Sequence, residues 1–131
     1  MSSSTTAPKN RRILAVEDDD ELLTMLTHLL GSLGEVQTAR DGMEAMDILN
    51  GGYPADLVVT DLMMPRMDGL TLARHMKSDS RLSRIPVVML TAKSSPRDMI
   101  EGINAGARHY VTKPFTAADL LAKAQKALAG K

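Results

Sequence analysis

The chain has 131 residues, of which 44% are hydrophobic and 24% are charged, as is typical of a single soluble globular domain. Sixteen basic residues balance sixteen acidic ones, so the overall charge does not favour nucleic acid or an anionic membrane as a partner. The absence of cysteine excludes disulfide scaffolds, thiolate metal sites and cysteine nucleophiles. No segment has the roughly 20 apolar residues that span a bilayer, and the polar start lacks a secretory signal, so we expect a cytoplasmic protein.

Short apolar runs alternate with amphipathic runs along the chain. Residues 1–10, MSSSTTAPKN, are expected to form a disordered arm, and residues 11–130 to form one domain. We expect strands at 11–17, 35–39, 55–61, 85–92 and 108–112. We expect helices at 18–34, 41–52, 69–79, 95–107 and 116–131.

Glycine, serine and proline set the expected ends of the helices. Gly34 is expected to end the first helix, and the pair Gly51-Gly52 the second. Ser95 is expected to cap the fourth helix, with Pro96 at its first position.

The alternation of strands and helices predicts an α/β fold, a doubly wound parallel sheet covered by helices on both faces. The strands at 11–17, 55–61 and 85–92 are the most apolar and should be central, whereas the polar strand at 35–39 suits an edge. In such sheets the ligand binds beyond the carboxyl ends of the strands, where the strand order reverses.

Chemically active side chains stand at these carboxyl ends. The strands close on Glu17 with Asp18, on Asp61, on Thr91 and on Lys113. Each has an ordinary interpretation, since acids begin helices and turns, threonine is common in strands, and a lysine can be solvated. Asp18 with Glu21 fits a capping box, for example. The ordinary interpretation explains the residues singly better than it explains their convergence.

Magnesium and phosphate chemistry account for the combination. Three neighbouring carboxylates would raise one another's pKa unless a cation intervened, and Mg²⁺ is a hard cation that prefers oxygen ligands. A carboxylate beside Mg²⁺ can attack phosphorus, and Asp61 lies between the other acids. Lys113 and the Thr91 hydroxyl would then contact the phosphoryl group. The three histidines fall on no strand end, which disfavours an imidazole metal site.

Four motifs resemble the receiver domains of two-component response regulators, in particular chemotaxis regulators. They are ILAVEDD at 13–19, DLVVTDLMMPRMDG at 56–69, VVMLTA at 87–92 and GARHYVTKPF at 106–115. The resemblance covers residues 11 to 130 and implies a flavodoxin-like fold with strand order 2-1-3-4-5. It also implies that Mg²⁺, or Mn²⁺ as a substitute, is held by Glu17, Asp18, Asp61 and the backbone carbonyl of Met63.

The remaining roles also follow from the resemblance. Asp61 is implied to be the phosphorylated aspartate, Thr91 the switch hydroxyl and Lys113 the lysine that pairs with the phosphoryl group. Tyr110 is implied to be the aromatic switch residue, and the peptide before Pro114 to be cis.

As a member of this family, the protein would accept a phosphoryl group from a histidine kinase or a histidine phosphotransfer protein. It would signal to an output protein through the fourth helix, fifth strand and fifth helix, without binding nucleic acid or membrane and without being an enzyme. Because the chain ends at Lys131, we expect a stand-alone receiver, with a receiver fragment of a larger regulator as the alternative. Met25 or Leu29 on the apolar first helix could belong to a surface that docks the phosphohistidine partner.

Three positions depart from the family pattern or leave it open. Glu17 stands where aspartate is more frequent, so its longer side chain must reach the metal directly or through water. Met63 and Lys93, two residues after Asp61 and Thr91, cannot orient an attacking water, which predicts a long-lived phosphoryl group.

Two rival functions are weaker. A Mg²⁺-dependent aspartyl-phosphate phosphatase would typically carry an acid at position 63, and a nucleotide or flavin module would need a glycine-rich or hydroxyl-rich loop where EDDDE stands at 17–21.

Overall fold

The computed structural model describes residues 11–92 and 96–130, so the predicted arm, the Ser95 cap and Lys93 lie outside the described residues. The strands are β1 Arg12–Val16, β2 Glu35–Ala39, β3 Leu57–Asp61, β4 Val87–Thr91 and β5 His109–Thr112. The helices are α1 Asp20–Leu30, α2 Gly42–Asn50, α3 Gly69–Lys77, α4 Pro96–Asn104 and α5 Ala117–Ala129.

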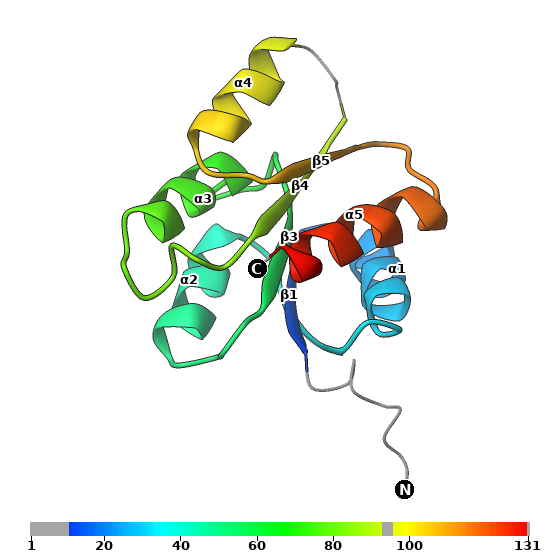
Figure 1. Ribbon diagram of the computed structural model, residues 1–131, viewed down its shortest axis with the longest axis horizontal. Helices are drawn as coiled ribbons and strands as arrows, with labels where there is room; N and C mark the ends of the chain where they lie inside the picture. The colour runs from blue at the N-terminus through cyan, green and yellow to red at the C-terminus, as the bar shows by residue number, and fades with distance from the viewer. Residues whose placement is uncertain (1–10, 93–95, 131) are drawn as a thin grey trace, which may run out of the picture.

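The five strands form one parallel sheet in the order β2-β1-β3-β4-β5, which confirms the predicted topology (Figure 1). All five residues of β3 and all five of β4 are buried, whereas β2 alternates between exposed and covered positions. The apolar runs therefore lie in the interior of the sheet and the polar run at its edge, as expected for a sheet with two covered faces.

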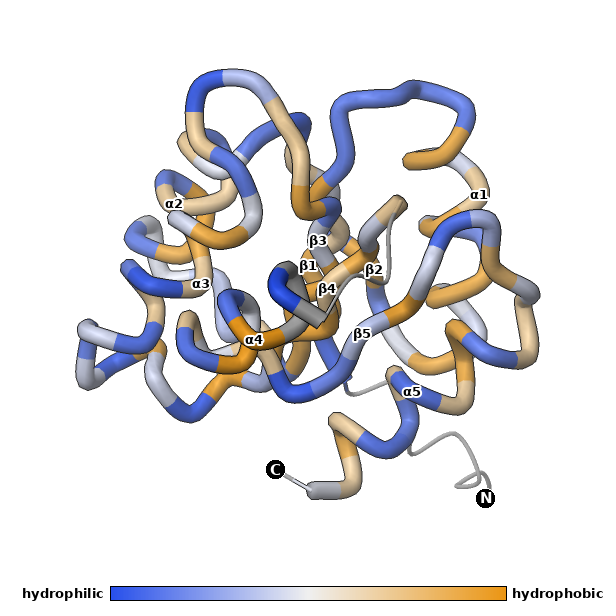
Figure 2. Tube along the Cα trace, turned by 90° about the horizontal axis from the view of Figure 1, so that it is seen from above, coloured by the Kyte–Doolittle hydropathy of each residue, from blue (hydrophilic) through white to orange (hydrophobic). Residues whose placement is uncertain are grey.

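Helices cover both faces, with α1 and α5 on one face and α2, α3 and α4 on the other (Figures 1 and 2). Alternate residues of each central strand feed the two resulting cores. In β3, Val58 belongs to the core under α2 and α3, whereas Leu57 and Val59 belong to the core under α1 and α5. This alternation fixes the register of β3 and with it the position of its last residue, Asp61.

Four helices begin at a residue whose side chain accepts a hydrogen bond from a backbone N–H three residues later. Asp19, Asp41, Asp68 and Thr116 fill this position in α1, α2, α3 and α5. Such caps satisfy N–H groups that the helix itself leaves unpaired.

Four helices end earlier than predicted, among them α4, which ends at Asn104 rather than at 107, and α5, which ends at Ala129 rather than at 131. The first helix ends at Leu30 with Gly31 as its cap, and not at Gly34. Gly34 instead lies against the residue that precedes β1, since a Cβ there would stand 2.5 Å from the Arg11 carbonyl oxygen. The third helix ends at Lys77, two residues earlier than predicted. The end at Gly51-Gly52 is confirmed, with Gly52 at φ 102°.

The two residues of α1 that were considered for docking differ in exposure. Met25 is 45% exposed, whereas Leu29 is half-buried and packs against the core under α1 and α5. Within the described part of the chain, no helix combines the length and apolar character required to cross a membrane.

Candidate functional site

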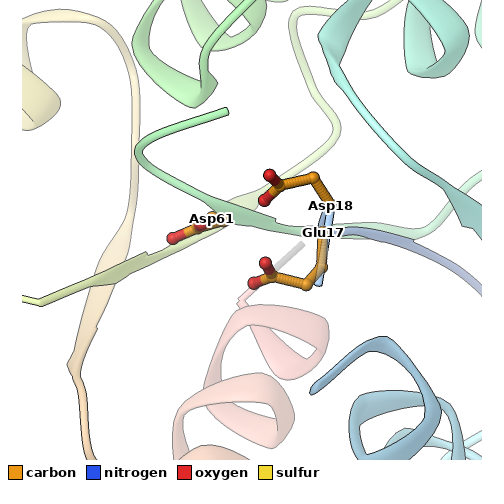
Figure 3. A group of neighbouring side chains, drawn as sticks. All are labelled: Glu17, Asp18 and Asp61. Carbon is orange, nitrogen blue, oxygen red and sulfur yellow. The ribbon is translucent and has the colours of Figure 1, made fainter. Parts of the chain in front are cut away.

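The carboxyl ends of β1 and β3 bring three acidic side chains together. Glu17 and Asp18 follow β1, Asp61 is the last residue of β3, and their carboxylates extend toward the same side of the sheet edge (Figure 3). One oxygen from each lies within 4.8 Å of the others. The structure therefore brings together the three acids predicted from the sequence.

Backbone hydrogen bonds anchor this edge to the neighbouring strands. The Glu17 N–H donates to the Ala39 carbonyl at 3.0 Å, and the Leu62 N–H to the Leu90 carbonyl at 2.8 Å. The Lys113 N–H donates to the Thr91 carbonyl at 2.7 Å. Each bond continues the ladder past the end of a strand, so the site stands on a rigid backbone.

The acidic residues that follow β1 have different contacts. Asp19, rather than Asp18, caps α1 by accepting the Leu22 N–H, so the capping box suggested for Asp18 and Glu21 is absent from this helix start. The Asp19 N–H donates to the Glu17 carboxylate at 3.1 Å and orients it. Asp18 is left exposed beside Glu17 and Asp61.

Lys113 is the cation of the site. Its Nζ lies 2.9 Å from Asp61 Oδ1 and 3.4 Å from Glu17 Oε1. These carboxylates are buried, with Glu17 1% and Asp61 6% exposed. The peptide between Lys113 and Pro114 is cis, which confirms the expectation from the resemblance. Among the described residues, one ammonium thus lies beside a group of three carboxylates, two of which it contacts.

The pKa directions follow from this crowding. Burial raises the pKa of the Glu17 carboxyl, the Asp19 N–H opposes the rise, and the charge of Asp61 adds to it. Burial lowers the pKa of Lys113, but Asp61 and Glu17 together hold it above its usual value. A site of buried, mutually repelling carboxylate oxygens suits a hard divalent cation, so the donor set fits Mg²⁺.

Thr91 and Tyr110 lie on the side of the site toward α4. Thr91, the last residue of β4, is 2% exposed and follows Leu90, which pairs with Asp61. It lines a cavity of about 340 Å³. The other lining residues are Leu62, Met63, Asp68, Leu70, Ala92 and Glu101. Tyr110 stands on β5 opposite Met89 and is half-buried.

Two glycines hold the loop between β3 and α3 through their backbone N–H groups. The Gly69 N–H donates to the Leu62 carbonyl at 2.9 Å, and a Cβ on Gly69 would collide with the Asp61 carbonyl oxygen. The Gly42 N–H donates to the Met67 carbonyl at 2.9 Å. Met63 within this loop is 72% exposed.

Sequence reasoning missed a further tie on the same loop. Arg66 has a φ of 65°, in the left-handed region that a non-glycine residue adopts at a cost, and its Nε donates to Asp41 Oδ2 at 2.8 Å. The hydrogen bond from Arg66 lowers the pKa of Asp41, although burial opposes this effect. Asp41 thus caps α2 and holds the loop beside the acidic cluster. Its position before Gly42 signalled only the cap.

Comparisons with known proteins agree with this geometry. The family model described as "Response regulator receiver domain" matches residues 13–125. The chain is 40% identical to the chemotaxis protein CheY-3 of Vibrio cholerae over 90% of its length and 92% of that protein. It is 41% identical to the response regulator MprA of a Mycobacterium species over 86% of its length, but spans only 48% of MprA.

Solved structures give the same result. A putative response regulator from Chloroflexus aurantiacus matches with a TM-score of 0.85 and 32% identity, over 91% of this chain and 98% of that one. The chemotaxis protein CheY4 of Vibrio cholerae, crystallised at low pH, matches with a TM-score of 0.84 and 32% identity, over 89% of this chain and 98% of that one.

Proposed function

The chain belongs to the response regulator receiver domains, and from this premise we propose that it is a signalling switch in which Asp61 accepts a phosphoryl group from a phosphohistidine partner. Receiver domains act as phosphoacceptors and generally bind Mg²⁺. The observation that carries the assignment to Asp61 is its position at the end of a fully buried strand, with Lys113 at 2.9 Å and two further acids beside it.

In the proposed reaction a carboxylate oxygen of Asp61 attacks phosphorus, the phosphorus–nitrogen bond to the donor histidine breaks, and that nitrogen takes a proton. Glu17, Asp18, Asp61 and the Met63 carbonyl would hold Mg²⁺, or Mn²⁺ in its place, which offsets charge on the transferring group. Lys113 exchanges part of its contact with Asp61 for a phosphoryl oxygen. Nothing is released except the partner, so the protein modifies itself and is not an enzyme.

The proposed output begins at Thr91, whose hydroxyl donates to a phosphoryl oxygen, and continues through Tyr110 to the surface of α4, β5 and α5. Ile100 and Ile103 on α4 are each 58% exposed, which supports an apolar protein partner there. The exposed Met25 on α1 supports a separate contact with the histidine kinase or histidine phosphotransfer protein.

Residues 11–130 are proposed to form this switch as one unit, in a cytoplasmic protein that contacts neither nucleic acid nor membrane. Relatives occur both as proteins of similar length, such as CheY-3, and as longer regulators, such as MprA. We favour the stand-alone role; the alternative is a receiver within a longer regulator. The rival assignment as a phosphatase is weakened by Met63, because such an enzyme would typically carry an acid at this position. It predicts sustained turnover of a phosphomonoester.

Intact mass spectrometry after incubation with acetyl phosphate and Mg²⁺ tests the proposal. We expect one added phosphoryl group, lost in Asp61→Asn and in EDTA. Asp56→Asn is the matched control, because Asp56 lies just before the other end of β3 and should leave phosphorylation intact. Modification that persists in Asp61→Asn would overturn the assignment.

A further inference from the structure

Gly102 occupies an unusual place in α4. It lies in the last turn of the helix and is buried, although glycine is less favourable in a helix than almost any other residue. Its φ is not positive, so the backbone conformation does not require glycine. The reason for glycine must therefore lie in what surrounds the Cα atom.

The ring of Tyr110 fills the space that a Cβ on Gly102 would need. The Tyr110 hydroxyl stands where the Cβ would be, and the Cε1 atom lies 2.9 Å from that point. Tyr110 reaches α4 from the edge strand β5 and also packs against the core under α2 and α3.

Other crowded glycines face a different obstacle. At Gly34, Gly42 and Gly69 the nearest atom to an added Cβ is a backbone carbonyl oxygen, which cannot turn away. At Gly102 the nearest atoms belong to one side chain, whose ring can leave by rotation about χ1. A side chain at position 102 would thus displace Tyr110 before it displaced the backbone.

We propose that Gly102 is a positioning residue for Tyr110: it opens a seat on α4 that holds the tyrosine ring across the gap between β5 and α4. The inference rests on the proposed function in so far as Tyr110 is the switch residue there. The seat couples the positions of α4 and β5, because the Tyr110 ring fits into it only while the two elements keep their present spacing. The identity of residue 102 then sets how strongly Tyr110 prefers this position.

Fluorescence of Tyr110 tests the seat directly. The chain has no tryptophan and two tyrosines, so Tyr53→Phe leaves Tyr110 as the only strong emitter. In that background we expect Gly102→Ala to raise the iodide quenching constant of Tyr110, because the ring moves into solvent. Ile103→Ala is the control, since Ile103 is the next residue of α4 and is 58% exposed. Equal quenching in Gly102→Ala and its parent would overturn the inference.

A thermal-unfolding cycle with Tyr110→Ala separates seating from a general effect on α4. With Tyr110 present, Gly102→Ala should lower the melting temperature, because the Cβ and the ring compete for one space. With Tyr110→Ala, the same change should raise it by about 3–5 °C, because alanine favours the helix and meets no ring. The same shift in both backgrounds would contradict the proposal.

Both measurements use the protein without a phosphodonor, so they decide on the seat alone. Adding acetyl phosphate and Mg²⁺ to the Tyr53→Phe protein then tests whether phosphorylation changes the quenching of Tyr110. A Gly102 effect without a phosphate effect would retain the seat and refute the switch role of Tyr110.

Discussion

The two ends of the sheet carry opposite charges and use them differently. The acidic edge, at the carboxyl end, brings Glu17, Asp18 and Asp61 together, and Lys113 contacts Glu17 and Asp61. The basic edge, at the amino end, has a hollow of about 620 Å³ lined by residues that include Arg11, Asp56, Arg84 and Arg108. In a chain with no net charge, acidic side chains thus gather at one end of the sheet and three arginines at the other.

The arginines of the basic edge do structural work. Arg11 donates to the Leu128 carbonyl at 3.3 Å and Arg108 to the Gly130 carbonyl at 3.4 Å, which satisfies the end of α5. At the acidic edge the carboxylates outnumber their cation, and two of them are buried. Within the described residues, the arginines of the basic edge thus have carbonyl partners, whereas the carboxylates of the candidate site outnumber the cation beside them.

Replacing one basic side chain at each edge should give the largest difference in the free energy of unfolding. Lys113→Met leaves Glu17 and Asp61 buried without their ammonium, so we expect the free energy of unfolding without metal to fall by roughly 2–3 kcal/mol. Lys113 is 24% exposed, which keeps the loss below that of a fully buried pair. Arg108→Met at the basic edge should cost no more than about 0.5 kcal/mol. Urea unfolding measures both, and equal losses would erase the contrast.

Mg²⁺ should stabilise the protein through the acidic edge alone. At ten times its dissociation constant we expect about 1.4 kcal/mol, seen as a rise in melting temperature. Asp18→Asn should weaken this response, whereas Asp20→Asn should leave it intact, because Asp20 belongs to the same acidic run but pairs with Arg40. A wild-type protein whose melting temperature ignores millimolar Mg²⁺ would argue against the metal site.

The lifetime of the phosphoryl group tests whether the acidic edge orients a water molecule for hydrolysis. Met63 is 72% exposed beside Asp61 and offers no group that orients a nucleophilic water. We expect Met63→Asn to shorten the lifetime several-fold, equivalent to about 1 kcal/mol in activation free energy. Loss of label with Mg²⁺ and without phosphatase measures it. A wild-type half-life of only seconds would refute the idea.

The smallest effect should come from the tie between Arg66 and Asp41. Arg66→Ala removes an ion pair whose arginine is 63% exposed, so we expect only a small loss in the free energy of unfolding at neutral pH, because water screens an exposed pair. Arg66→Gly should lose less, because glycine adopts the φ of 65° without strain. Urea unfolding should rank the two variants, and a greater loss in Arg66→Gly would contradict the strain.

The same pair has a defined pH dependence. Because Arg66 lowers the pKa of Asp41, the stabilisation is present above the usual value of 3.8 and is lost as the pH falls through the lowered pKa. The difference between wild type and Arg66→Ala should therefore disappear in acid. A constant difference down to that range would mean that the ion pair is not its cause.

The acidic edge could be predicted from the sequence because the end of an apolar run marks the end of a buried parallel strand. The apolar runs before Glu17 and Asp61 locate two carboxyl ends, and topology places these side by side. The contact between Asp41 and Arg66 joins residues 25 positions apart, and that between Gly102 and Tyr110 joins a helix to a strand. Such side-chain contacts have no periodic signal. Gly34 misled the prediction, because glycine suits both a helix end and a close backbone approach.

The strands that carry Asp61 and Tyr110 differ in how many neighbours they have. The strand β3 pairs with β1 and β4, whereas β5 pairs only with β4 among the strands of the described residues. Amide hydrogens of β3 should exchange with solvent only when the whole protein unfolds, while those of β5 can exchange through local opening. Asp61, which is proposed to meet a phosphorus atom in one geometry, thus lies on a strand whose backbone we expect to open only with the whole protein. Tyr110, the proposed switch residue, lies on a strand whose backbone can open locally.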